Sequence, residues 1–353
     1  MALAILALLG ATAFASHAQT AVVPKSFAGA KQPQVAVTVS NVGFVAFGKG
    51  NSIYVARSTN SATSFEPPQL VSTVPKLALG MRRGPRIVST ANAIAISAIS
   101  HDDGNLYCWV SNDDGVHWTK GARVNDGSGA AREGLHAMAA HGNTVAMAWL
   151  DLRSGKTDLR GAVSKDSGAT WSTNFVIYQS PDGHICECCH PNIAFGPDGK
   201  LFVVWRNWLN RSRDLYLAES NDLEHFGAAE KLGTGSWPLN ACPMDGGGLA
   251  INTNGAPVTV WRRGTEILSS GNGTAEQSVA SESSQPCLAI TAAGTNVVWH
   301  THGGLMLRTP HQQSPFQFAA SGKFPSISAL GDKVIVVWET GETDAPIVAK
   351  IFR

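Results

Sequence analysis

The chain has 353 residues, of which 44% are apolar and 15% are charged, and its formal net charge is +1. This length and composition allow a large buried core and exclude a disordered protein. The near-zero charge gives no basis for a nucleic-acid partner or for binding to an anionic membrane surface. Its 36 glycines and 10 tryptophans favour many tight turns and large aromatic anchors between short strands.

Residues 1–18 have the pattern of a secretory signal peptide. An apolar run from Ala2 to Leu9 precedes a stretch of small residues that ends at Ala18 with a small-x-small cleavage pattern. No later run approaches the about 18 apolar residues of a spanning helix, so no membrane insertion is expected. We predict a single mature domain at 19–353, secreted or periplasmic, whose six cysteines can form disulfides.

A strand-turn-strand unit recurs through the rest of the chain. The second strands of these units are expected at 42–47, 93–99, 144–149, 201–205, 257–261, 296–300 and 333–338. Five of them carry a tryptophan at or near the end, and these tryptophans are 56, 56, 38 and 39 positions apart (Trp149, Trp205, Trp261, Trp299 and Trp338). Such spacings are typical of propeller blades.

The repeat predicts an all-β fold, a β-propeller with seven blades. Similar units follow one another without intervening helical periodicity, which favours a ring of small sheets over one sandwich. Six blades remain an alternative because the later units are short. The last unit ends at Arg353 after three strands. We expect segment 22–28 to supply its outer strand, so that N- and C-terminal strands close the ring.

Two phrases of the form Ser-x-Asp-x-Gly-x-x-Trp follow expected third strands. Their defining residues are Ser111, Asp113, Gly115 and Trp118 in the first phrase and Ser164, Asp166, Gly168 and Trp171 in the second. Asp and Gly suit a tight turn, and the final aromatic can cover the sheet edge. These phrases resemble the Asp-boxes of the sialidase and BNR-repeat propeller superfamily. The resemblance implies a structural role for them, because fold does not determine function.

A second resemblance involves the segment CECCHPNIAFGPDGKLFVVWRN, which begins at Cys186. Together with the later phrase NACPMDGG at 240–247 it is similar to secreted bacterial sialidase-like proteins with a Cys-x-Cys-Cys segment. This resemblance supports an exported propeller and does not assign an activity.

The cysteine-rich segment allows three interpretations. In the first, Cys186, Cys188, Cys189 and Cys242 form two disulfides that link the starts of neighbouring innermost strands in units four and five. In the second, these cysteines bind a metal ion together with His184 and His190. In the third, the Cys-x-x-Cys-His form of Cys186, Cys189 and His190 attaches a haem covalently.

Polar residues at the start of several first strands define a candidate pocket. Because the innermost strands of a propeller line its central channel, these side chains are expected to converge there. The candidates are Arg82, Arg83, Arg86, Arg132, Glu133, His136, His190 and Asp245, with Arg206 and Arg262 at the ends of second strands. The predicted ligand-binding set is Arg83, Arg86, His136, His190, Arg206 and Arg262. Clustered arginines suit a carboxylate, whereas salt bridges within a blade are the alternative role for each.

The sialidase resemblance implies a tyrosine nucleophile activated by a glutamate, with an aspartate as acid/base. The chain has only four tyrosines, and none falls at the expected channel. Glu133 and Asp245 are therefore the candidate catalytic carboxylates for another kind of glycoside hydrolysis.

Three functional hypotheses follow from the sequence. The first is a secreted sialidase-like propeller that binds, and in one version hydrolyses, a carbohydrate or other anionic small molecule, with no cofactor. The second is a redox protein with a metal ion or haem at the Cys186 to His190 cluster. The third is a non-catalytic extracellular interaction scaffold.

Overall fold

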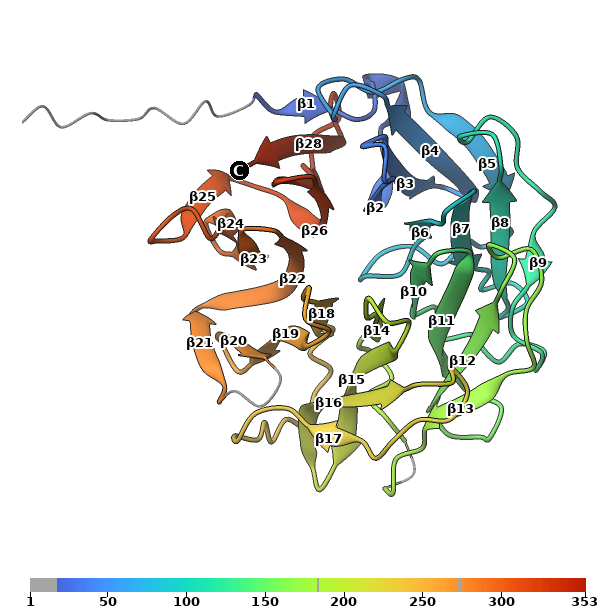
Figure 1. Ribbon diagram of the computed structural model, residues 1–353, viewed down its shortest axis with the longest axis vertical. Helices are drawn as coiled ribbons and strands as arrows, with labels where there is room; N and C mark the ends of the chain where they lie inside the picture. The colour runs from blue at the N-terminus through green and yellow to red at the C-terminus, as the bar shows by residue number, and fades with distance from the viewer. Residues whose placement is uncertain (1–17, 183, 272–274) are drawn as a thin grey trace, which may run out of the picture.

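The structure is a computed structural model that describes residues 18–182, 184–271 and 275–353. Seven four-stranded antiparallel sheets are arranged as blades around a central axis (Figure 1). The predicted all-β, seven-bladed propeller is confirmed and the six-bladed alternative is excluded. The predicted signal peptide lies outside the described residues except for Ala18. No helix in the described part of the chain is long and apolar enough to cross a membrane.

The first four blades follow one another along the chain, each from its innermost to its outermost strand. Blade one has β2 (Lys31–Val37), β3 (Gly43–Lys49), β4 (Ser52–Ser58) and β5 (Gln69–Thr73). Blade two has β6 (Arg86–Ser89), β7 (Ile94–Ile99), β8 (Leu106–Ser111) and β9 (Ala122–Arg123). Blade three has β10 (His136–His141), β11 (Thr144–Asp151), β12 (Asp158–Ser164) and β13 (Phe175–Tyr178). Blade four has β14 (Asn192–Phe195), β15 (Leu201–Leu209), β16 (Ser212–Ser220) and β17 (Glu230–Lys231).

The last three blades complete the circle. Blade five has β18 (Gly248–Ile251), β19 (Pro257–Arg263), β20 (Glu266–Gly271) and β21 (Gln277–Ala280). Blade six has β22 (Ser283–Thr291), β23 (Gly294–Thr301), β24 (Gly304–Arg308) and β25 (Phe316–Ala319). Blade seven has β26 (Lys323–Leu330), β27 (Lys333–Glu339) and β28 (Ile347–Phe352), and its outer strand is β1 (Thr20–Ala21).

The two ends of the chain close the ring, as predicted, although the closing strand lies slightly earlier than expected. Thr20 pairs with Ala349 and Ala21 with Val348. The predicted segment 22–28 contributes only its first residue to this pairing, because residues Lys25–Phe27 form a short 3-10 helix, η1. Blade seven is therefore built from both ends of the chain.

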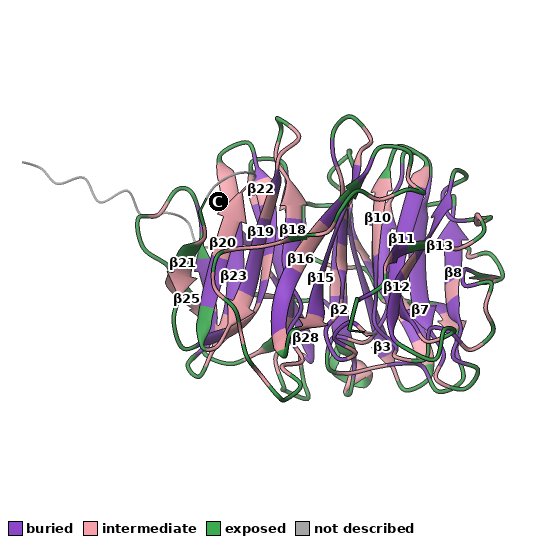
Figure 2. Cartoon of the chain, turned by 90° about the horizontal axis from the view of Figure 1, so that it is seen from below, coloured by how far each residue is buried: buried purple, intermediate pink, exposed green. Residues whose placement is uncertain are grey.

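The core lies between neighbouring sheets. Every residue of β7 is buried, and Figure 2 shows buried strands forming the body of the ring, with exposed loops at its edges. Trp149, Trp205 and Trp338 are fully buried between blades. Truncating a buried tryptophan to alanine typically costs about 3–5 kcal/mol, so the regular tryptophans hold the ring together.

Candidate functional site

The innermost strands place one residue per blade at the same level of the central channel. In each blade, this residue pairs with the second-strand residue that precedes the tryptophan position. The seven channel-ring residues are Gln34, Arg86, Ala137, Asn192, Gly248, Cys287 and Ser326. Five of the seven are polar in character, so the channel can form hydrogen bonds.

Proline precedes the channel-ring residue in five blades. These prolines are Pro33, Pro85, Pro191, Pro286 and Pro325. An innermost strand is the edge of its sheet, and proline is tolerated there because its missing N–H leaves no ladder bond unmade. The X-Pro-polar phrase at the start of a first strand therefore marks a side chain at the channel.

A cavity of about 230 Å³ occupies this channel and is lined by residues from all seven blades. Its polar lining comes mainly from Gln34, Arg82, Arg86, His190, Asn192 and Ser326. Among the described residues, no aspartate, glutamate or tyrosine lines it. The cavity therefore presents cationic and neutral polar groups without a carboxylate.

Arg82 crosses the channel from blade two to blades six and seven. Its Nε donates to Gln285 Oε1 at 2.6 Å, and one terminal nitrogen donates to the Gln285 carbonyl at 3.1 Å. The other terminal nitrogen donates to the Pro325 carbonyl at 2.9 Å. A guanidinium has five N–H donors, so these three bonds leave two donors for a ligand.

Arg86 is held against the channel wall by carbonyl groups. Its guanidinium donates to the carbonyls of His136, Gly84, Pro85 and Arg82. Burial and the neighbouring Arg82 charge lower the pKa of Arg86 to about 9. Burial likewise lowers the pKa of Arg82. The charges of Asp245 and Glu339 partly oppose the effect of burial on Arg82. Within the described residues, however, no carboxylate forms an ion pair with Arg82 or Arg86, so two cations line the cavity without a directly paired carboxylate.

His190 also faces the cavity, at the start of blade four. Its Nδ1 is buried and has no hydrogen-bond partner among the described residues. Gly246 packs against the ring, where a Cβ would lie 2.7 Å from Nδ1. Burial and the charges of three arginines lower the pKa of His190 well below its usual value, so the imidazole is neutral.

Two of the predicted site residues lie beside the cavity without lining it. Arg83 Nε donates to the Glu133 carbonyl at 2.7 Å, which joins the loops before blades two and three. Burial raises the pKa of Glu133, while Arg83 opposes this shift. Arg83, Arg86 and Glu133 therefore do not face one cavity: Arg86 alone lines it.

Asp245 and Arg206 are buried in the junction between blades four and five. Arg206 donates to the carbonyls of Asp245, Arg213 and Arg262, at 2.7–2.9 Å. Asp245 Oδ2 accepts from the Gln285 N–H at 2.8 Å, and burial raises the pKa of Asp245. No hydrogen bond or ion pair links Asp245 to Glu133 in the described chain. The structure does not assemble these carboxylates as a catalytic pair.

His136 and Arg262 also lie outside the central cavity. His136 is buried, with Nε2 2.9 Å from Ser97 Oγ. Arg262 lines a separate hollow of about 210 Å³ together with His300 and His302. His136 instead contacts Ser97 of blade two, and Arg262 Nε donates to the Gly264 carbonyl at 2.7 Å, so both side chains are engaged by residues outside the cavity.

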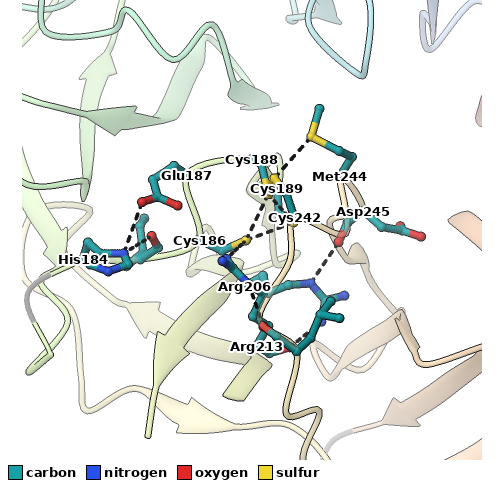
Figure 3. Close-up of a disulfide and its surroundings, with 12 residues drawn as sticks. His184, Cys186, Glu187, Cys188, Cys189, Arg206, Arg213, Cys242, Met244 and Asp245 are labelled. Carbon is teal, nitrogen blue, oxygen red and sulfur yellow. Dashed lines mark hydrogen bonds and ion pairs between the residues drawn. A yellow bond between two sulfur atoms is a disulfide. The ribbon is translucent and has the colours of Figure 1, made fainter. Parts of the chain in front are cut away.

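The cysteine segment folds into a compact sulfur cluster in the loops that precede β14 and β18 (Figure 3). One disulfide, Cys188–Cys242, joins the loops before β14 and β18. Cys186 and Cys189 are free thiols whose Sγ atoms lie 3.2 Å apart. The staple between blades four and five is present, but the second predicted disulfide is not formed.

The residues of the sulfur cluster do not fit the predicted metal site or the predicted haem attachment. Three cysteine sulfurs lie within 4.8 Å of one another, but Cys188 is already bonded to Cys242. Within the described chain, neither His184 nor His190 joins the sulfur cluster. Two thiols do not complete a four-coordinate metal site. Cys186 and Cys189 are buried and face each other, so they do not fit thioether attachment of a porphyrin.

The two Ser-x-Asp-x-Gly-x-x-Trp phrases form the same hydrogen-bonded turn after the third strands of their blades. Ser111 Oγ donates to Asp113 Oδ1 and accepts from the Gly115 N–H, each at 2.8 Å. Trp118 Nε1 donates to the Gly115 carbonyl at 3.1 Å. The second phrase repeats these bonds with Ser164, Asp166, Gly168 and Trp171. The turns are structural and lie away from the cavity.

The comparisons with known proteins identify the fold and no family. No protein-family model matches the chain, and no curated protein matches it by sequence. A protein of unknown function from Dyadobacter fermentans is similar in structure, with 13% identity, a TM-score of 0.57, and coverage of 96% of this chain and 99% of that one.

Two solved structures of known activity share the architecture. Virginiamycin B lyase from Staphylococcus aureus, in an inactive form with quinupristin, has 10% identity and a TM-score of 0.58 over 94% of this chain and 98% of that one. A Hadza microbial sialidase has 14% identity and a TM-score of 0.51 over 92% of this chain and 66% of that one. These likenesses show a shared β-propeller fold.

Proposed function

We propose that the protein binds a small carboxylate-bearing carbohydrate in its central cavity, with Arg82 and Arg86 as the recognition groups. The observation that carries this proposal is the presence of two buried guanidinium groups, without an ion-pair partner, in the wall of a cavity that has no acidic side chain. A carboxylate bound between them would form the direct ion pair that neither guanidinium has in the described residues.

The energetics favour an anion at this position. A buried cation without an anionic partner is costly, and each arginine has a pKa lowered by its burial. A bound carboxylate relieves that cost through charge-assisted hydrogen bonds, which are roughly twice as strong as neutral ones. The two donors left on Arg82 provide a direct site for such bonds.

The size and polarity of the cavity favour one sugar ring. Its volume of about 230 Å³ lies below the ~300–1,000 Å³ of pockets that hold drug-sized ligands. Gln34, Asn192 and Ser326 present amide and hydroxyl groups that can donate to and accept from sugar hydroxyls.

We propose binding without hydrolysis for this cavity. Glycoside hydrolysis by a protein normally requires a nucleophile or base and an acid beside the scissile bond. No carboxyl or phenol group of the described chain lines the cavity, and Glu133 and Asp245 lie in separate environments. The predicted catalytic role of these two residues therefore receives no support from the geometry.

We also propose that the protein functions outside the cytoplasm, in the periplasm or in the medium. The signal-like segment 1–18 and the Cys188–Cys242 disulfide support this location, because disulfides persist in oxidising compartments. Intact mass of the exported protein is the measurement: a mature chain beginning at Gln19 is expected, and a chain retaining residues 1–18 in the cytoplasm would contradict it.

Calorimetric titration tests the ligand class. Glucuronate is expected to bind at low ionic strength, whereas glucose, which has a similar ring and no carboxylate, is expected to bind far more weakly. Added salt should weaken glucuronate binding, because charge attraction is screened. Equal affinity for the two sugars would refute a carboxylate site, and release of fluorophore from a fluorogenic sialoside would refute binding without hydrolysis.

A further inference from the structure

Four cysteine sulfurs meet in the loops that precede β14 and β18, outside the proposed sugar site (Figure 3). Cys186 Sγ lies 3.5 Å from Cys188 Sγ, one of the two sulfurs of the Cys188–Cys242 disulfide. Cys189 Sγ lies 3.2 Å from Cys186 Sγ and 4.0 Å from Cys188 Sγ. The free thiol of Cys186 is therefore in contact with the disulfide, and a second free thiol, Cys189, is in contact with Cys186.

The surroundings of Cys186 stabilise its thiolate form. Arg213 donates from a terminal nitrogen to Cys186 Sγ at 3.0 Å, and the Arg213 guanidinium stacks on Trp208. The hydrogen bond from Cys189, helped by the charges of Arg213 and Arg206, outweighs burial and lowers the pKa of Cys186 to about 6. The Arg213 contact and the lowered pKa both favour the thiolate, the form that attacks disulfides.

We infer that these four cysteines form a thiol–disulfide exchange centre, in which Cys186 opens the Cys188–Cys242 disulfide. The Cys186 thiolate attacks Cys188 Sγ and forms a Cys186–Cys188 bond. The Cys188–Cys242 bond breaks, and its electron pair leaves on Cys242 as a thiolate. One disulfide and one thiolate exist before and after the step, so no external oxidant or reductant is required.

The difference in solvent exposure between the attacking and the leaving sulfur favours this direction of exchange. Cys186 and Cys188 are buried, whereas Cys242 is exposed on its loop. The departing thiolate therefore enters water, where it is solvated and can take up a proton. A second exchange is possible in the same cluster: Cys189 attacks Cys186, and its proton passes to the Cys188 sulfur that leaves. The released Cys242 is then available to the disulfide of another molecule.

Non-reducing peptide mapping tests the centre on the native protein. Trypsin places Cys186, Cys188 and Cys189 in one peptide, 166–200, and Cys242 in another, 232–262. A static disulfide keeps these two peptides cross-linked. If exchange occurs, incubation of the folded protein with N-ethylmaleimide traps Cys242, and peptide 232–262 is released with one maleimide. Peptide 166–200 then retains one internal disulfide, so its mass is lower by two hydrogens than that of the same peptide without a disulfide.

Matched variants identify the attacking sulfur. Cys186→Ser is expected to preserve the cross-linked pair and to slow the labelling of Cys242 at least tenfold. Cys108→Ser removes a buried thiol elsewhere and should label like the wild type. Should Cys186→Ser fail to fold, Cys189→Ser keeps the attacking sulfur and should still release peptide 232–262.

Three results would overturn the inference. The first is a wild-type cross-link that persists throughout the incubation. The second is release of peptide 232–262 from Cys186→Ser at the wild-type rate. The third is release without an internal disulfide in peptide 166–200, which would mean that the Cys188–Cys242 bond does not form in the folded protein.

Discussion

Arg82 and Gln285 meet across the central channel although 203 positions separate them in the chain. The Arg82 Nε donates to Gln285 Oε1 at 2.6 Å, and Gln285 Nε2 donates to the Met244 carbonyl at 2.7 Å. The Gln285 N–H donates to Asp245 Oδ2. One glutamine therefore connects the loop of blade two with that of blade five and fixes the arginine over the cavity.

Replacing Gln285 by alanine is expected to destabilise the fold. The change removes an acceptor for Arg82 and a donor to Met244, and leaves buried groups without partners, which costs about 1–3 kcal/mol. Urea unfolding measures the loss. Gln313→Ala, an exposed glutamine, should change stability by less than about 0.5 kcal/mol. An equal effect of the two substitutions would show that the cross-channel bonds are not made.

Loss of the Ser164 hydroxyl from the Ser-x-Asp-x-Gly-x-x-Trp turn of blade three is expected to lower stability without changing ligand binding. Ser164→Ala removes both the bond to Asp166 and the acceptor for the Gly168 N–H. We expect a loss of about 1–2 kcal/mol in the unfolding free energy. Affinity for glucuronate should stay within twofold of the wild type, because the turn lies away from the cavity. A large loss of affinity would assign the turn a direct role.

Because His136 is buried, we expect the stability of the folded protein to decrease in acid. Burial and the charge of Arg86 lower its pKa well below the usual value, so the folded protein keeps this ring neutral. The unfolded chain takes up a proton as the pH falls below about 6.5, and stability therefore decreases there, by at most about 1.4 kcal/mol per pH unit for this group. Above about pH 6.5 this histidine is neutral in both the folded and the unfolded chain, so it does not make stability depend on pH there.

His136→Gln checks this assignment through urea unfolding between pH 5 and pH 8. The variant should lose part of the acid-dependent decrease, while His311→Gln, at an exposed position, should keep it. His190 has a similarly lowered pKa, so a fraction of the decrease should remain in His136→Gln. Identical pH profiles for wild type and His136→Gln would contradict the buried neutral ring.

Cys242→Ser should destabilise the protein through the unfolded state. The disulfide spans 54 positions, and a loop of that size corresponds to at most about 4 kcal/mol in the chain-entropy account. We expect a loss of about 2–4 kcal/mol, measured under non-reducing conditions. Ala241→Ser, one residue earlier on the same exposed loop, is the control and should be nearly neutral. If Cys242→Ser left the free energy of unfolding unchanged, other contacts would have to hold the two loops together.

The fold could be predicted from the sequence because its signals are local and repeated. Each tryptophan position follows a short apolar run, and the turn residues lie within a few positions of it, so a count of units gave the seven blades. The closing strand was placed slightly too late. Pairing of β1 with β28 joins opposite ends of the chain, and local sequence does not fix its register.

The candidate site was only partly predictable. Arg86 and His190 line the cavity as expected, because they stand at the start of first strands. Arg206 follows Trp205 and was expected at the pocket, but its guanidinium binds carbonyls of blades four and five, which only the packed ring brings together. The X-Pro-polar phrases did contain a signal for Gln34, Asn192 and Ser326, and this signal was missed.

The central claim is that buried arginines in the channel bind a carboxylate, and calorimetric titration of Arg86→Gln with glucuronate tests it most directly. Glutamine keeps a hydrogen-bonding side chain but removes the charge, so affinity should fall at least tenfold, which is about 1.4 kcal/mol. Arg308→Gln, which removes an exposed charge on β24, should bind like the wild type. Unchanged affinity in a folded Arg86→Gln variant, or equal losses in both variants, would contradict the account.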